Sequence, residues 1–232
     1  MSDHLTPWYR TVIHASTPLA GWWGRLQVVG LEHLPQSGPV LLCGNHDSYW
    51  DTVTTGLAAM PRRQVRALAK SSLWKTPIAA HVLNGMGQIP IDRGKGDAGA
   101  LDRAVYELRE HGVCLGVFPE GTRSLGRELR ARSGFGRLAE RVPEAAIVCA
   151  AITGTVDIPK FPRNRPQVRV EFFLPQGGPL APGESPSDFT ARLMREIRAK
   201  APYAVAGRAR ARRIAAGADP EADAGAGGQR RA

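Results

Sequence analysis

The sequence VLLCGNHDSYWD, residues 40–51, joins an apolar run to a histidine and, five residues later, to an aspartate. The apolar run has the length and composition of a buried strand, and a helix is expected to begin near Tyr49. On one continuous helix, side chains five positions apart diverge by roughly 140°. His46 and Asp51 therefore meet only if a turn separates strand from helix, and the segment predicts a strand–turn–helix corner of an α/β protein.

His46 and Asp51 form a candidate general base. A neutral imidazole accepts a proton near pH 7, and a carboxylate on its other ring nitrogen fixes the tautomer and stabilises the imidazolium. Ser48 lies between the two residues, but no Gly-x-Ser-x-Gly elbow surrounds it. The pattern therefore favours direct general-base catalysis over a covalent serine intermediate.

Residues 44–47, GNHD, also resemble a signature of dinuclear metallophosphoesterases. Those enzymes hold two metal ions with further His and Asp ligands, typically in an upstream Asp-x-His and a downstream Gly-His-x-His. None of the six histidines of this chain occurs in either pattern. We therefore expect an active site without a metal ion.

Two further polar clusters each follow an apolar run. Arg93 follows residues 88–91, and the polar residues 120–124 follow residues 113–118. In open α/β sheets, ligands bind beyond the carboxyl ends of the strands. We therefore expect His46, Arg93 and residues 120–123 to converge at one edge of the sheet.

Together these clusters resemble the three sequence blocks of the 1-acylglycerol-3-phosphate acyltransferases, a family of glycerolipid acyltransferases. The matching blocks are residues 45–51 (NHDSYWD), 87–93 (GQIPIDR) and 118–124 (FPEGTRS), in the order and at the spacing of the family. Flanking similarity extends over about residues 20–200. The resemblance implies an α/β fold and an acyltransferase activity.

The resemblance implies a mechanism without an acyl-enzyme. His46 deprotonates a hydroxyl of a glycerol phosphate acceptor, Asp51 orients the imidazole, and the alkoxide attacks an acyl thioester directly. Arg93 and Arg123 suit the acceptor's phosphate, because a guanidinium offers a fixed fork of donors and keeps its charge. Glu120 is expected to bind a glycerol hydroxyl or to orient Arg123.

Three other positions complete the expected substrate-binding set. Gly121 lets the backbone approach a ligand closely, and Lys70, after the apolar run 65–69, adds a donor near the oxyanion or the phosphate. Besides the catalytic pair, the expected site residues are Lys70, Arg93, Glu120, Gly121, Thr122 and Arg123.

The implied reaction transfers a fatty acyl chain from acyl-CoA or acyl carrier protein to the sn-2 hydroxyl of lysophosphatidate, giving phosphatidate, with no cofactor. Cys149 stands where the family usually has a proline, and this departure leaves open another lysophospholipid or a glycolipid as acceptor. A basic nucleic-acid-binding protein without catalysis is the alternative from a different class. It assigns no role to His46 or Glu120, and no nucleic-acid-binding signature is present.

Length and composition indicate one catalytic domain. The chain has 232 residues, 43% of them hydrophobic, which suffices for one substantial core. Helical periodicity starts at Asp97 and again after Ser185, so a mainly parallel sheet flanked by helices is expected. The apolar runs that predict strands are 26–31, 40–43, 65–69, 88–91, 113–118, 146–152 and 168–174.

The expected domain organisation has three parts. The acyltransferase domain covers residues 25–206 and is followed by a basic, Ala/Gly-rich and disordered tail, 207–232. Residues 1–24 form an amphipathic helical segment that Pro18 kinks. Its apolar side comprises Trp8, Val12, Leu19, Trp22 and Trp23.

Residues 1–24 also predict membrane association. Three of the five tryptophans lie there, and tryptophan favours the membrane interface. No apolar run is long enough to span a bilayer, and no signal peptide is recognisable. A formal charge of +10 attracts anionic lipid. We therefore expect a peripheral or monotopic protein on the cytoplasmic face of the cell membrane.

The cysteines agree with a cytoplasmic location. Cys43, Cys114 and Cys149 each lie within a predicted strand. Their odd number and the lack of Cys-His metal spacing predict buried thiols in a reducing compartment.

Overall fold

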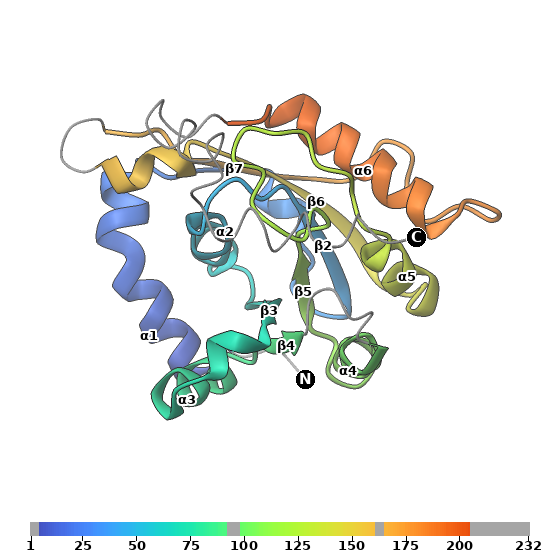
Figure 1. Cartoon of the computed structure of the whole chain (residues 1–232), viewed down its shortest axis with the longest axis horizontal. Helices are drawn as coiled ribbons and strands as arrows, with labels where there is room; N and C mark the ends of the chain where they lie inside the picture. The colour runs from blue at the N-terminus through green and yellow to red at the C-terminus, as the bar shows by residue number, and fades with distance from the viewer. Residues whose placement is uncertain (1–4, 92–97, 161–164, 205–232) are drawn as a thin grey trace, which may run out of the picture.

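The computed structural model describes residues 5–91, 98–160 and 165–204, which form a seven-stranded sheet with helices on both faces (Figure 1). The strands are β1 (Gln27–Val29), β2 (Val40–Gly44), β3 (Val65–Lys70), β4 (Ile89–Ile91), β5 (Cys114–Val117), β6 (Ala146–Thr153) and β7 (Arg169–Phe173). They lie in the order β1-β7-β6-β2-β5-β3-β4, and every neighbouring pair is parallel except β6 and β7. The predicted mainly parallel α/β sheet is confirmed.

Helices cover both faces of this sheet. On one face lie α4 (Ala98–His111), α5 (Gly134–Arg141) and α6 (Pro186–Lys200), and on the other lies α2 (Trp50–Ala59), packed against α1 (Pro7–Ser16). The helix α3 (Pro77–Gly85) joins β3 to β4. The short helical turns are η1 (Thr17–Trp23), η2 (Leu31–His33), η3 (Ser71–Trp74) and η4 (Thr155–Lys160).

Both predicted helices after the first motif are present. α6 begins after Ser185, whose hydroxyl accepts the backbone N–H of Asp188 at 3.1 Å. α4 occupies the other predicted helical segment, and Asp97, its expected N-cap, lies outside the described residues. Periodicity therefore located both helices correctly, and the predicted cap is confirmed for α6.

β2 is buried along its whole length at the centre of the sheet. Side chains alternate across a strand, so Leu41 and Cys43 pack in the core shared with α4, α5 and α6, whereas Val40 and Leu42 pack in the core shared with α2. Burial on both faces explains why this strand reads as one continuous apolar run.

The N-terminal segment is helical and shares a core with the rest of the protein. α1 ends at Ser16, and a π-helical turn containing Pro18 follows. Tyr9 and Ile13 are buried against α2, and the Tyr9 hydroxyl accepts the Val65 N–H at 3.2 Å. No helix in the described ranges has the length and apolarity needed to cross a bilayer.

Cys149 lies on the face of β6 that packs beneath α5 and α6, in the same core as Cys43. Burial raises the pKa of the Cys149 thiol to about 12, so it is protonated at neutral pH. The three cysteines are buried thiols, as the sequence predicted. Because Cys149 faces away from the cavity described below, its side chain has no direct influence on a ligand there.

Arg63, in the turn between α2 and β3, is a buried charged residue near the amino ends of the central strands. Its guanidinium donates to the carbonyls of Pro35, Gly38 and Gly112 at 3.1, 3.0 and 2.7 Å. These carbonyls belong to the loops that enter β2 and β5. One side chain therefore fixes the starting points of the two central strands.

Replacing Arg63 with methionine should lower the free energy of unfolding by about 3 kcal/mol, because buried carbonyls lose a charged donor and find no other. Urea denaturation followed by circular dichroism measures this change. Arg103→Met, at an exposed position of α4, serves as control and should change the free energy by less than about 0.5 kcal/mol. Equal effects of the two substitutions would contradict the role of Arg63.

Candidate active site

His46 and Asp51 meet at the corner between β2 and α2. His46 Nδ1 lies 3.0 Å from Asp51 Oδ2. Asp51 stands in the first turn of α2 and is fully buried, whereas His46 reaches the wall of a cavity. The strand–turn–helix geometry predicted from the spacing of five is therefore present.

Asp51 is surrounded by donors. Its Oδ2 accepts the backbone N–H groups of Asp47 and Ser48 at 2.6 and 2.7 Å, and its Oδ1 accepts the hydroxyl of Thr155 at 2.5 Å. An oxygen that already accepts two N–H groups is an acceptor for His46 as well, so His46 Nδ1 donates. In this tautomer Nε2 carries the free lone pair, so this is the ring nitrogen that can accept a proton.

The imidazole plane is held by an aromatic neighbour. The rings of His46 and Phe118 stack with centroids 4.6 Å apart and planes 18° apart. Phe118 belongs to the third sequence block, at the carboxyl end of β5, which pairs in parallel with β2. The predicted convergence of the first and third blocks at one sheet edge is therefore observed.

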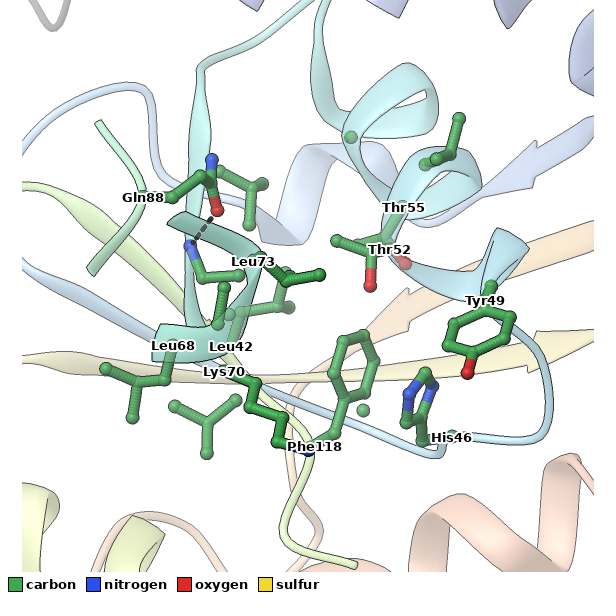
Figure 2. A pocket seen from close by; sticks show the side chains of 18 of the residues that line it. Leu42, His46, Tyr49, Thr52, Thr55, Leu68, Lys70, Leu73, Gln88 and Phe118 are labelled. Carbon is green, nitrogen blue, oxygen red and sulfur yellow. Dashed lines mark hydrogen bonds between the residues drawn. The ribbon is translucent and has the colours of Figure 1, made fainter. Parts of the chain in front are cut away.

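A cavity of about 600 Å³ opens beside His46. Figure 2 shows His46, Tyr49 and Thr52 facing it from the corner of β2 and α2, with Lys70 and Leu68 on another wall. Much of its wall is apolar and comes from α1, α2, β3, α3 and the central strands. The apolar lining residues include Ile13, Leu42, Val65, Leu68, Leu73, Leu83, Met86 and Ile152.

The charged groups of the cavity wall all have the same sign. Lys70, Arg123 and Arg132 line it, and no aspartate or glutamate of the described chain does. The Arg123 guanidinium lies 3.7 Å from the centre of the Tyr49 ring, a cation–π contact that fixes its plane. The wall thus combines apolar area with three cations, which suits a ligand with a hydrocarbon part and an anionic part.

Two of the other expected ligand-binding residues line the cavity, and a third is not described by the structure. Thr122 and Gly121 line the cavity, and Gly121 has a φ of 69°. This positive φ favours glycine, and a Cβ there would also displace the side chain of Arg132, whose Nε would lie 2.7 Å away. Arg93 lies outside the described residues, so the structure gives it no position.

Glu120 does not line the cavity. Its Oε2 accepts the backbone N–H of His46 at 2.7 Å, and its Oε1 accepts Nε of Arg198, on α6, at 3.1 Å. The sequence predicted that this carboxylate binds a glycerol hydroxyl or orients Arg123. In the structure it instead holds the backbone of His46 and pairs with Arg198. Burial raises the pKa of Glu120, and the charge and hydrogen bonds of Arg198 act against that rise.

Arg198 also binds the carboxylate of Asp47 with Nη1 and Nη2, at 2.9 and 3.0 Å. Burial acts to lower the pKa of Arg198, but the hydrogen bond to Asp47 and the charges of Glu120 and Asp47 outweigh it, so the pKa is raised. The sequence analysis missed this arginine, because no local pattern connects the end of α6 with a loop 151 positions earlier.

Asn45 closes the corner on the side of β6. Its side-chain amide donates to the carbonyl of Ile152 at 2.9 Å and accepts the N–H of the same residue at 2.8 Å.

Within the described residues, no cluster of three or more His, Cys, Asp or Glu side chains is suited to hold a metal ion.

Comparison with known proteins gives one family match. The family model described as Acyltransferase matches residues 25–159. The computed fold is similar to the crystal structure of the 1-acyl-sn-glycerophosphate acyltransferase from Thermotoga maritima, with a TM-score of 0.58, 21% identity and coverage of 82% of this chain and 80% of that one.

Three curated relatives are similar in sequence. The 1-acyl-sn-glycerol-3-phosphate acyltransferase of Bacillus subtilis is 27% identical over 63% of this chain and 71% of its own length. The protein of the same name from Borreliella burgdorferi is 36% identical over 52% and 47%, and the lyso-ornithine lipid O-acyltransferase of Pseudomonas aeruginosa is 29% identical over 63% and 52%. The chain thus spans about half the length of the latter two relatives.

Proposed function

Because the chain belongs to the acyltransferase family, we propose that it transfers a fatty acyl chain from acyl-CoA or acyl carrier protein to the sn-2 hydroxyl of lysophosphatidate, giving phosphatidate. One observation carries the proposal: the buried His46–Asp51 pair opens onto a cavity whose wall is apolar except for three cations and a few uncharged polar groups. A lysophosphatidate has a hydrocarbon chain, a hydroxyl and a phosphate to match these features.

In the proposed mechanism, Nε2 of His46 removes the proton of the acceptor hydroxyl while Asp51 stabilises the imidazolium that forms. The alkoxide attacks the thioester carbonyl and gives a tetrahedral intermediate. When this intermediate collapses, the carbon–sulfur bond breaks, and the departing thiolate takes the proton from His46. The acyl chain passes directly to the acceptor, and no residue of the enzyme is acylated.

The phosphate is proposed to lie against the basic part of the wall. Arg123 and Lys70 were expected there from the sequence, and Arg132 lines the same cavity. Arg93, which follows β4, is proposed for the same group on the resemblance of its sequence block. A buried arginine whose plane is fixed by Tyr49 is suited to hold a phosphate through two parallel hydrogen bonds.

A second candidate acceptor is another lysolipid. The relative from Pseudomonas aeruginosa, named for a lyso-ornithine lipid, is as similar to this chain as the relatives named for lysophosphatidate. Transfer to either acceptor needs the same base and the same acyl thioester, so the two candidates differ in the acceptor molecule alone.

The protein is proposed to bind the cytoplasmic face of the cell membrane without crossing it. Trp8, Trp22, Leu73 and Ile78 are 38%, 68%, 53% and 80% exposed, respectively. Trp8, on α1, contacts His81, on α3, edge to face, so these helices are neighbours. Leu73 also lines the cavity, which places an apolar surface beside the route of a lipid into the site.

The proposed domain organisation follows from these parts. Residues 25–206 hold the catalytic groups, residues 1–24 contribute to membrane binding, and the tail 207–232 is proposed to be dispensable for the reaction.

Release of free thiol from palmitoyl-CoA and oleoyl-CoA, with purified protein in anionic liposomes, tests the reaction. It should depend on lysophosphatidate, and His46→Ala should lower kcat by about 10² to 10⁴-fold. Ser48→Ala, in the same loop, is the matched control and should keep kcat within about threefold, because no serine nucleophile is used.

Wild-type turnover in His46→Ala would refute the proposed base, and loss of turnover in Ser48→Ala alone would favour a covalent mechanism. If neither CoA donor gives thiol release, the assay is repeated with acyl carrier protein donors and with lyso-ornithine lipid as acceptor. Activity with lyso-ornithine lipid alone would identify it as the acceptor in place of lysophosphatidate. No thiol release with any pair of donor and acceptor would overturn the proposed function.

Arg123→Met should raise the KM for lysophosphatidate by about tenfold or more and change kcat less, because a charged hydrogen bond to the phosphate contributes about 1.5 to 3 kcal/mol. Arg127→Met is the control, since Arg127 lies in the same loop, exposed and away from the cavity. An unchanged KM in Arg123→Met would place the phosphate elsewhere.

Replacing both Leu73 and Ile78 with serine should weaken binding to anionic vesicles by about tenfold or more, since a side chain withdrawn from water contributes about 1.5 to 3 kcal/mol. Vesicle co-sedimentation measures the partition. Leu174→Ser, at an exposed leucine directly after β7, serves as control, because β7 is separated from β3 by three strands of the sheet. Equal partitioning of the three proteins would contradict the proposed membrane surface.

A further inference from the structure

We infer that Arg198, near the end of α6, is a positioning residue for the His46–Asp51 pair. It lies outside the cavity wall, so it has no contact with a ligand there. It binds the carboxylate of Glu120, which accepts the backbone N–H of His46, and the carboxylate of Asp47, the next residue of the loop. The kinetic part of this inference rests on the proposed function, and its structural part does not.

Arg198 joins two segments that are distant in the sequence. Its Nη1 and Nη2 bind the two oxygens of Asp47 at 2.9 and 3.0 Å, and its Nε binds Glu120 Oε1 at 3.1 Å. Nη2 contacts the same oxygen of Glu120. The side chains of Arg198, Asp47 and Glu120 are 9%, 3% and 1% exposed, so little water screens these contacts.

Both residues that Arg198 binds also contact the catalytic pair. Glu120 Oε2 accepts the backbone N–H of His46 at 2.7 Å, and the backbone N–H of Asp47 donates to Asp51 Oδ2 at 2.6 Å. The latter oxygen is the one that His46 Nδ1 contacts. Two links therefore lead from the guanidinium to the pair, one through Glu120 to the backbone of His46 and one through Asp47 to the acceptor oxygen of Asp51.

The positive charge of Arg198 compensates two buried negative charges. Asp47 and Glu120 are two buried carboxylates beside one loop, and the other donors to them among the described residues, the Asn45 amide, the Ser124 hydroxyl and the His46 N–H, are neutral. Without Arg198 the two charges would repel each other and lack a compensating positive charge. A guanidinium has the planar set of donors that can serve both carboxylates at once, whereas a lysine ammonium is a point charge. Arg198 is itself held by Tyr203, whose ring centre lies 3.9 Å from its guanidinium carbon.

Arg192 provides a matched comparison on the same helix. Its guanidinium pairs with Glu184 at 2.9 Å and donates to the carbonyls of Gly178 and Pro179. These partners belong to the loop before α6, far along the helix from the catalytic loop. A substitution there removes an ion-paired arginine of α6 and leaves the contacts of His46 intact.

The test measures thiol release by the full-length wild type and by Arg198→Met, Arg198→Lys and Arg192→Met. In Arg198→Met, kcat should fall by about 10 to 100-fold, because a displacement of about 1 Å in a catalytic group has effects of this size. Arg198→Lys should lie between that variant and the wild type. KM for both substrates should change by less than about twofold, and Arg192→Met should keep the wild-type kcat.

A second readout requires no substrate. In protein labelled with ¹⁵N-histidine, the Nδ1–H proton of His46, assigned by its absence in His46→Gln, reports the contact with Asp51. This signal should shift or vanish in Arg198→Met and stay in place in Arg192→Met. Should Arg198→Met fail to fold, Arg198→Lys, which keeps the charge, decides the question by the same two measurements.

A wild-type kcat and an unmoved His46 signal in Arg198→Lys and in every folded Arg198 variant would overturn the inference. A higher KM with an unchanged kcat would also overturn it, because that result assigns Arg198 to substrate binding. If the wild type itself transfers no acyl group, the proposed function fails, and the His46 signal still decides the role of Arg198.

Discussion

The buried carboxylate of Asp51 is the constraint from which the geometry of this site follows. A charge with no exposure to water must be met by donors from the protein. Here the donors are two backbone N–H groups of the preceding turn, the hydroxyl of Thr155 and the ring of His46. These contacts determine how the chain turns from β2 into α2, so the conformation of the loop and the tautomer of the histidine have the same cause.

The parallel sheet brings residues from neighbouring strands to this corner. β2 pairs in register with β5 on one side and with β6 on the other, so the segments that follow these three strands leave the sheet at one edge. Phe118 and Glu120 come from the first of these neighbours, and Thr155 follows the second. Arg63 fixes the opposite ends of β2 and β5. The site is thus held by backbone pairing over residues that are far apart in the sequence.

The sequence predicted the parts of this arrangement that have a local cause. A continuous apolar run located β2. The spacing of five between His46 and Asp51 located the corner, because side chains five positions apart diverge on one continuous helix. The antiparallel direction of β7 had no such signal. It follows from the connection between β6 and β7, whose described residues, 154–160 and 165–168, hold the short 3₁₀ helix η4 and no long crossover helix of the kind that usually joins parallel strands. The partner of Glu120 had no local signal either, because a charged residue near the end of a helix is usually exposed.

The distribution of charge around the cavity connects the fold with the chemistry. The carboxylates of Asp47, Asp51 and Glu120 all point away from the cavity and are bound by donors inside the protein, whereas Lys70, Arg123 and Arg132 line it. A carboxylate on the wall would repel a phosphate and compete with it for the arginines. With these acids bound inside the protein, the proposed anionic head group would meet only cations among the charged side chains of the described wall, and the imidazole would keep a carboxylate on Nδ1 while Nε2 is available to the proposed acceptor hydroxyl. Asp47 and Glu120 can stay in that position because α6 brings a guanidinium to them, so the helix farthest from the first motif in the sequence completes its surroundings.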